Sequence, residues 1–190
     1  MKQLILVLVL AFGINALFAQ LQAQINAGLD FPGNQEWSAI DGSDDFDSYI
    51  GFSPSIEILR PVGTDVLIGG GFEFQLSRSI DAGDRNSTYA FIPIYLSAKF
   101  GFPRNGAIRP ELLGNVGFNI FMADNYTYQF DTKGGMYFAF GAGIHHTKGL
   151  TVDFMYRTSK GVLDCGSYYG SSTVIDVTQT NLTLRLGYRF

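Results

Sequence analysis

The chain has 190 residues, a formal net charge of -4 at pH 7, 16% charged residues and 15% aromatic residues. The mildly acidic balance argues against a nucleic-acid partner. One cysteine, Cys165, cannot form an internal disulfide, so a disulfide-stapled fold is excluded. The charged fraction is low beside the roughly 25% of an average soluble domain.

The first 19 residues have the features of a secretory signal peptide. Lys2 precedes an apolar run over 4–12, and small residues lead to Ala19. This run is too short for a membrane anchor. We therefore expect cleavage after Ala19, a signal peptide over 1–19 and one exported domain over 20–190.

The exported part shows strict alternation of apolar and polar residues, which is the pattern of β-strands. In the segment 88–102, Ile92, Ile94 and Leu96 share an apolar face opposite Tyr95 and Ser97. The same split recurs in seven other segments, so eight strands are predicted. The segments are 20–31, 49–60, 66–77, 88–102, 108–122, 135–145, 150–157 and 181–190.

The connections between these segments alternate in length. Tight turns are expected at 61–65, 103–106 and 147–149, and longer connections at 32–48, 78–88, 123–134 and 158–176. Short turns at one rim and long loops at the other are the usual layout of outer-membrane barrels.

Alternation alone does not say which face is inside. A soluble lipocalin-like barrel would turn the apolar face inward around a ligand, whereas a membrane barrel turns it to lipid. The polar face is rich in Gly, Ser, Asn and Gln, while the outside of a soluble barrel normally carries many charges. A closed barrel also leaves no unpaired strand edge in lipid. The sequence thus predicts an all-β, eight-stranded, antiparallel, transmembrane up-and-down β-barrel.

The few charges on the polar face are nearly balanced in sign. Buried charges need partners, since removing one member of a buried pair costs about 3–5 kcal/mol. We therefore expect an ion-pair network inside the lumen, formed by Glu57, Glu73, Lys99, Arg109, Glu111, Asp153, Arg157, Arg185 and Arg189.

Aromatic residues on the apolar face gather toward strand ends, as in the girdles at membrane interfaces. Phe100, Phe102, Tyr188 and Phe190 are expected at one level. A second set is expected at the other level: Phe31, Phe52, Phe118, Phe138 and Tyr156.

The chain has a signal peptide, eight alternating strands and an aromatic C-terminus, and its segments IPIYLSAKFGF (92–102) and LTLRLGYRF (182–190) look like strands of one known family. In these features it resembles the small outer-membrane β-barrel family typified by the outer membrane protein A barrel and outer membrane protein X. The resemblance implies residence in a Gram-negative outer membrane and contact with its lipid. It also implies insertion by the barrel assembly machinery with periplasmic chaperones, with Phe190 as the assembly signal.

Eight strands enclose a lumen just wide enough for side chains. We therefore expect a structural or surface-interaction role, possible contact with an extracellular partner through the loops, and no cofactor. A narrow gated channel, porin-like in character, is the alternative, and a soluble ligand-binding barrel is a weaker one.

Catalysis and metal binding are not expected. The only histidines, His145 and His146, lie beside a short turn, and no acid and serine are arranged with them. The acidic stretch DGSDDFD at 41–47 lacks the ligand order of a calcium loop. Aromatic residues on the loops could contact a partner: Trp37, Tyr126, Tyr128, Tyr168 and Tyr169.

Overall fold

The computed structural model describes residues 20–39, 42–76, 78–81, 86–102, 106–125, 131–164 and 174–190, and its regular elements are all strands. No helix in these ranges has the length and apolar character needed to cross a bilayer. The strands are β1 (Gln22–Asp30), β2 (Asn34–Ala39), β3 (Gly42–Asp47), β4 (Gly51–Val62), β5 (Val66–Glu73), β6 (Arg78–Asp81), β7 (Asn86–Gly101), β8 (Ile108–Asn125), β9 (Asp131–His146), β10 (Leu150–Asp164) and β11 (Val174–Arg189).

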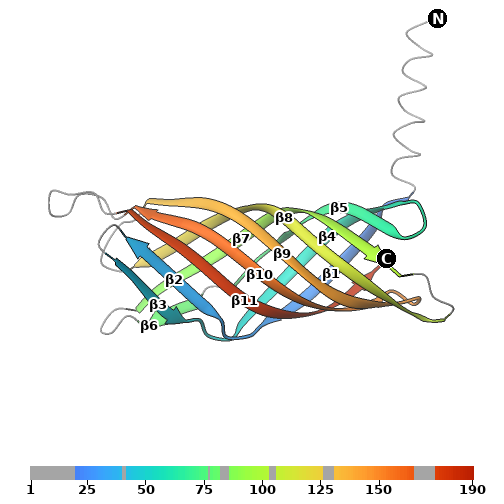
Figure 1. Cartoon of the computed structure of the whole chain (residues 1–190), viewed down its shortest axis with the longest axis horizontal. Helices are drawn as coiled ribbons and strands as arrows, with labels where there is room; N and C mark the ends of the chain where they lie inside the picture. Colours follow the sequence, from blue (N-terminus) through green and yellow to red (C-terminus); the bar gives the residue numbers. More distant parts are fainter. Residues whose placement is uncertain are drawn as a thin grey trace, which may run out of the picture.

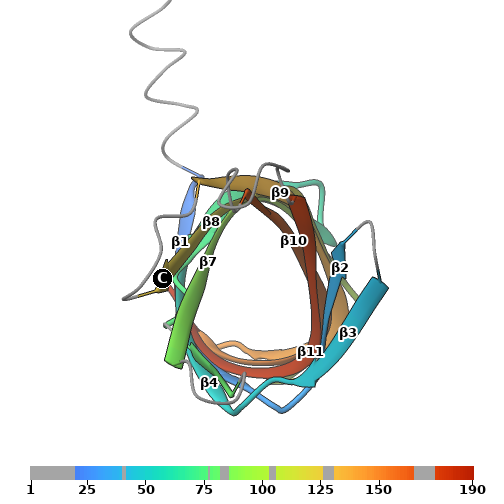
Figure 2. The same ribbon diagram turned by 90° about the vertical axis from the view of Figure 1, so that its left-hand side faces the viewer.

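Eight of these strands form a closed antiparallel ring. Their order is β1-β4-β5-β7-β8-β9-β10-β11, and β1 returns to pair with β11. The closing register sets Ile25 opposite Tyr188 and Leu29 opposite Leu184. Figure 1 shows the long barrel from the side, and Figure 2 shows the ring from one end. The predicted eight-stranded barrel is confirmed.

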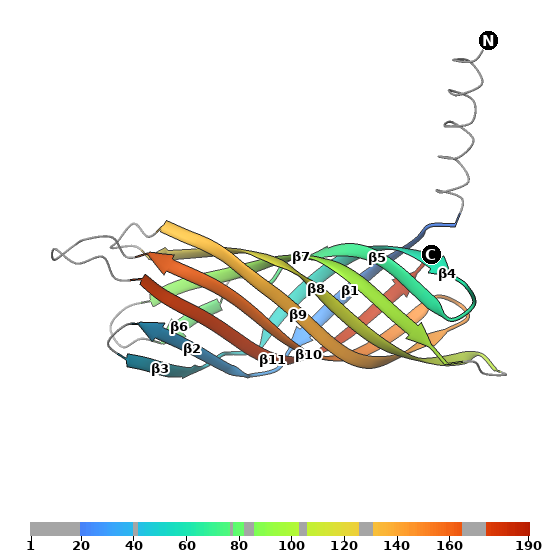
Figure 3. The ribbon, with the colours of Figure 1, turned by 45° about the horizontal axis from the view of Figure 1, so that its top comes forward.

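Two tight turns, after β4 and β9, lie at one end of the barrel, and the expected turn at 103–106 lies largely outside the described residues. Gly63 and Gly149 occupy the two described turns with φ angles of 73° and 96°. These angles lie in the left-handed region that glycine enters without a steric penalty. Strands β2, β3 and β6 lie at the opposite end, as Figure 3 shows.

The expected long connections are in large part strands, and this prediction was wrong. The region 32–48 contains β2 and β3, which pair with each other, and β2 also pairs with β11. The region 78–88 contains β6, paired with β7. β10 continues to Asp164 rather than ending at 157, and β11 begins at Val174 rather than 181.

The reason is that the backbone pairing of the strands continues beyond the segments in which apolar and polar side chains alternate. On the outer face of β11, Leu182, Leu184 and Leu186 give way to Thr178 and Thr180 toward the β2 end. Alternation fades there because the outer side chains are no longer apolar, but the backbone ladder with β10 continues through Val174. The walls of the barrel therefore extend beyond its apolar band.

The barrel is apolar outside and largely polar inside. Leu96 is 67% exposed and Phe140 61% exposed on the outer face, whereas Glu57 and Asn119 are completely buried. A soluble ligand-binding barrel would show the reverse. The structure therefore confirms that the apolar face points outward, and the soluble alternative is wrong.

Aromatic residues also enter the lumen. Tyr89, Phe91, Tyr95, Phe121 and Tyr137 are all buried, as the inward side of the alternation predicts. Two apolar clusters result. The first contains Tyr95, Leu113, Tyr137, Ala139 and Met155, and the second contains Tyr89, Phe91, Phe121, Leu163 and Val177 with Trp37, Ala123 and Ile175 packed against it.

A charge placed on the lipid-facing surface should destabilise the barrel according to its depth. We expect Leu96→Arg, in the middle of the apolar face of β7, to lower the free energy of unfolding by about 2–4 kcal/mol. Thr178→Arg, beyond the apolar band on β11, is the matched control and should cost about 0–1 kcal/mol. Urea unfolding in lipid vesicles measures both. Equal losses would contradict the outward assignment.

Candidate functional site

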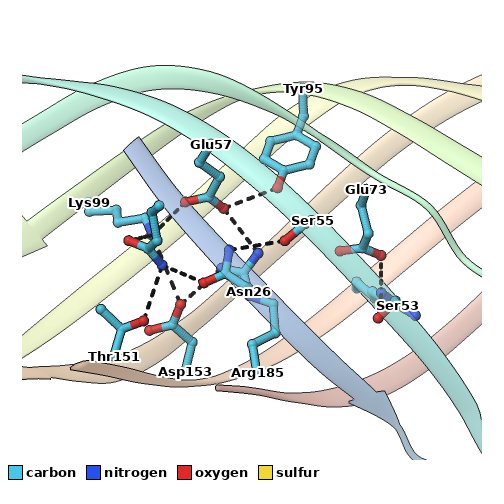
Figure 4. Close-up of polar contacts among 12 residues, drawn as sticks. Asn26, Ser53, Ser55, Glu57, Glu73, Tyr95, Lys99, Thr151, Asp153 and Arg185 are labelled. Carbon is cyan, nitrogen blue, oxygen red and sulfur yellow. Dashed lines mark hydrogen bonds and ion pairs between the residues drawn. The ribbon is translucent and has the colours of Figure 1, made fainter. Parts of the chain in front are cut away.

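The central tier of the lumen joins two cations to two carboxylates. Lys99 on β7 lies 2.6 Å from Glu57 on β4, measured from Nζ to Oε2. Arg185 on β11 binds the other oxygen of Glu57 at 3.1 Å and Asp153 on β10 at 3.0 Å. Lys99 also lies 3.9 Å from Asp153. Figure 4 shows these four side chains converging from separate strands.

Neutral groups complete this central tier. The Tyr95 hydroxyl donates to Glu57 at 3.0 Å, and Lys99 donates to the side-chain oxygen of Gln24 at 3.0 Å. Gln24 in turn donates to Asn26 at 2.7 Å. These bonds matter because a buried charge is tolerated only when its hydrogen-bonding capacity is used as well as its charge balanced.

A second tier lies toward the short turns. Arg189 on β11 forms a two-pronged bond to Glu111 on β8, with N–O distances of 2.9 and 2.8 Å. Its Nε also donates to Gln24 at 2.9 Å, so Gln24 links this tier to Lys99. His145 Nδ1 lies 3.9 Å from Glu111. A cavity of about 140 Å³ opens beside these residues at the mouth of the lumen.

A third tier lies toward the β2 end and is centred on Arg157 of β10. Its guanidinium contacts Glu73 on β5 and lies 2.5 Å from Asp30 on β1, while its Nε donates to Asn181 at 2.8 Å. The hydroxyls of Ser53 and Thr183 donate to Asp30 at 3.0 and 2.9 Å. Every member of this tier is almost inaccessible to solvent.

The structure thus brings eight of the nine predicted network residues together in pairs inside the lumen. Arg109 differs, because it binds Asp65 at 2.7 Å at the mouth, where the two side chains are 33% and 32% exposed. It also donates to the carbonyl oxygens of Thr64 and Gly101. Arg109 lies at the mouth, outside the buried tiers, because it is the second residue of β8.

Sequence reasoning missed Asp30, Gln24 and Asp65 as partners. Asp30 and Gln24 share the inward face of the first segment, so the alternation that identified Glu57 carried a signal for both. Asp65 lies in a turn, where alternation gives no direction, and only the structure places it beside Arg109.

The predicted girdle aromatics all lie on the outer face. Each is at least 36% exposed, from Phe31 at the lower limit to Phe190 at 69%. Phe100 and Phe102 pack edge to face at 5.2 Å, and Tyr188 and Phe190 at 4.8 Å between ring centroids. Their position at a membrane interface remains a prediction.

Metal and catalytic sites are not evident in the described ranges. No three His, Cys, Asp or Glu side chains there are placed to hold a metal ion, and neither histidine there hydrogen bonds to a serine. Asp44 and Asp45 of the acidic stretch are exposed on β3. Cys165 and the loop tyrosines Tyr126, Tyr128, Tyr168 and Tyr169 lie outside the described residues, as does the expected signal peptide.

The tiers predict different costs for two arginines. Arg157→Leu should lower the free energy of unfolding by about 3–5 kcal/mol, because it leaves Asp30 and Glu73 buried without their cation. Arg109→Leu, at the half-open mouth, should cost about 0–1 kcal/mol. Urea unfolding in vesicles, followed by Trp37 fluorescence, compares them. Similar costs would show that the Arg157 contacts are not buried ion pairs.

Comparison with known proteins places the chain among membrane barrels. The sequence profile of the outer membrane protein beta-barrel domain matches residues 4–190. No curated protein has a significantly matching sequence.

Solved structures with the same fold are of low sequence identity. Outer membrane protein OprG from Pseudomonas aeruginosa aligns with a TM-score of 0.60 at 9% identity, covering 90% of this chain and 95% of that one. Neisserial surface protein A aligns at 0.52 and 18%, covering 90% and 97%. AlkL, solved in lipid bilayers, aligns at 0.51 and 18%, covering 90% and 89%. The chain belongs to the outer membrane protein beta-barrel family and lies in the outer membrane of a Gram-negative bacterium.

Proposed function

We propose that this protein is a closed scaffold that holds an extracellular β-extension at the cell surface, with a structural or surface-interaction role. The observation that carries this proposal is the set of ion pairs that cross the lumen. Arg157, Arg185 and Lys99 are each no more than 2% exposed and are bonded to carboxylates from other strands. Paired side chains occupy the central lumen.

Closure is tested by permeability. The purified barrel in planar bilayers should give no steady conductance in KCl, and vesicles that contain it should not swell in sugar solutions. A large-pore porin reconstituted in parallel is the positive control. Steady conductance by the unmodified barrel would overturn the closed scaffold.

A narrow gated channel is the second candidate, and one observation favours it. Glu57 is shared between Lys99 and Arg185, while Asp153 lies within 4 Å of both cations. Two cations and two carboxylates in one group have more than one pairing. In this candidate function the four groups exchange partners to open a path, and no charge is left unpaired. In the scaffold proposal these pairs serve only to stabilise the barrel.

The surface part of the proposal rests on the β2–β3 hairpin. It continues the wall of the barrel past the apolar band, and its residues Glu36, Asp44 and Asp45 are exposed. Polar, exposed side chains at this end fit the external medium, whereas the short turns after β4 and β9 fit the periplasm. Exposed elements on a rigid scaffold are where binding functions concentrate.

Cysteine labelling tests this orientation. In a Cys165→Ser background, Asp45→Cys should react with a membrane-impermeant maleimide on intact cells, because β3 lies outside. Thr147→Cys, at the exposed turn after β9, should react only after the cells are broken. The reverse pattern would refute the proposed orientation and with it the surface role.

We also propose a non-enzymatic role. The fold class includes outer-membrane enzymes as well as other barrels. Here His145 lies in the short-turn mouth beside Glu111, and His146 accepts a backbone hydrogen bond from Lys148 at 3.1 Å. Neither arrangement supplies an activated nucleophile.

We further propose that residues 1–19 form a cleaved signal peptide and that the barrel domain over 20–190 is inserted by the barrel assembly machinery after delivery by periplasmic chaperones. Phe190 is the proposed recognition residue. Its ring is 69% exposed, and its backbone N–H donates to Ala23 O at 2.8 Å, so the side chain is available while the backbone closes the seam with β1.

Replacing the ring should therefore affect assembly more than the fold. Phe190→Ala keeps the backbone bond to Ala23 and should lower the fraction of folded, heat-modifiable barrel in the outer membrane, whereas Phe190→Tyr should preserve it. Phe31→Ala, which removes another exposed ring, is the control for general loss of aromatic surface. Normal assembly of Phe190→Ala would remove the proposed signal role.

A further inference from the structure

The apolar cluster toward the β2 end crosses the lumen from wall to wall. Phe91 comes from β7 and Val177 from β11, and both are at most 1% exposed. Three strands separate β7 from β11 in either direction around the ring, so these two strands lie on opposite walls. A single buried cluster that includes side chains from both walls spans the lumen between them.

The packing within this cluster is tight. The rings of Phe91 and Phe121 stack at 4.8 Å between centroids, and Tyr89 packs edge-on against Phe91 at 6.0 Å. Gly161 on β10 makes room for Phe121, because a Cβ atom at that position would lie 2.6 Å from the ring carbon Cγ. Leu163 fills the same wall two residues further along β10.

The cluster is separate from the ion pairs. On β10, Leu163 lies six positions beyond Arg157, which corresponds to about 20 Å along the strand. On β7, Phe91 is eight residues from Lys99. The lumen therefore contains three charged tiers and, further toward the β2 end than the Arg157 tier, a cluster whose described members are all uncharged.

We propose that the cluster of Tyr89, Phe91, Phe121, Leu163 and Val177 is a second, uncharged seal that keeps the lumen closed to ions on the extracellular side. This deepens the proposed closed scaffold and rests on its orientation. A packed apolar constriction blocks ions because an ion passing it would lose its water without gaining a polar partner. The seal does not depend on charge pairing, so it stays closed when an ion pair is broken.

The seal has a consequence for the candidate gate. Breaking the Glu57 pairs alone leaves the extracellular side shut, so unchanged conductance of a Glu57→Ala variant does not distinguish a stabilising ion pair from a gate. The ion-pair network and the apolar cluster therefore need separate tests, and the apolar cluster is tested from the extracellular side.

A cysteine placed between the ion pairs and the apolar cluster tests the two closures separately. Ser159 on β10 is buried between Arg157 and Leu163, and serine to cysteine changes little volume. In a Cys165→Ser, Ser159→Cys protein on intact cells, we measure labelling by a small, charged, membrane-impermeant methanethiosulfonate. With the seal intact, labelling should be negligible. Phe91→Ala with Phe121→Ala should raise its rate about tenfold or more.

Three further variants make the result decisive. Phe118→Ala with Phe138→Ala removes two rings from the lipid face instead and should leave labelling unchanged. Glu57→Ala with Lys99→Ala opens the central charged tier at constant net charge and should also leave it unchanged. Leu163→Ser with Val177→Ser opens the cluster from the other walls and should raise labelling, which covers a failure of the Phe91 variant to fold.

The outcomes separate the two proposals. The seal is refuted if neither folded cluster variant raises labelling, or if the Glu57 and Lys99 variant raises it as much. The closed scaffold fails independently if the unmodified barrel conducts steadily in planar bilayers. All variants are first checked for heat-modifiable mobility, so that only folded barrels are compared.

Discussion

The backbone pairing between β1 and β11 is the constraint on which the rest of the structure depends. A strand edge in the hydrocarbon layer would leave N–H and C=O groups without partners, at a cost of several kcal/mol each. The ring removes that edge by joining the first strand to the last, from Gln24 and Arg189 to Asp30 and Thr183. Closure then forces successive side chains alternately into lipid and into a narrow lumen.

That division explains why charged residues are few and why they are paired. A side chain that faces inward in the middle of the barrel is almost inaccessible, so Arg185 and Arg157 are stable only because each binds two carboxylates from other strands. Toward the β2 end, the lumen is filled instead by stacked rings and aliphatic side chains. The lumen thus contains ion pairs, which depend on charge, and an apolar cluster, which does not.

The pattern of alternation predicted the strands of the barrel and which residues share a face, because successive side chains of a strand point to opposite sides. The scarcity of charge on the polar face then predicted that the apolar face points outward. The prediction failed where the inward or outward direction of a side chain does not determine its environment. The β2–β3 hairpin was expected to be a loop, since both faces of a strand beyond the lipid can be polar. Arg109 was expected in the buried network. Alternation predicts that its side chain faces inward but not how deep in the lumen it lies. Its place as the second residue of β8 leaves it at the mouth.

The sequence by itself determined the class of the fold and the sign of each face, because period-two alternation and the scarcity of charge are local properties of the chain. Tertiary structure decided which charges meet. The partner of Arg157 is Asp30 as well as Glu73, from strands that are distant in sequence, and Phe91 and Val177 belong to one cluster only because the closed ring sets their two strands on opposite walls. Such contacts are set by the number of strands and their stagger around the ring, which no single segment encodes.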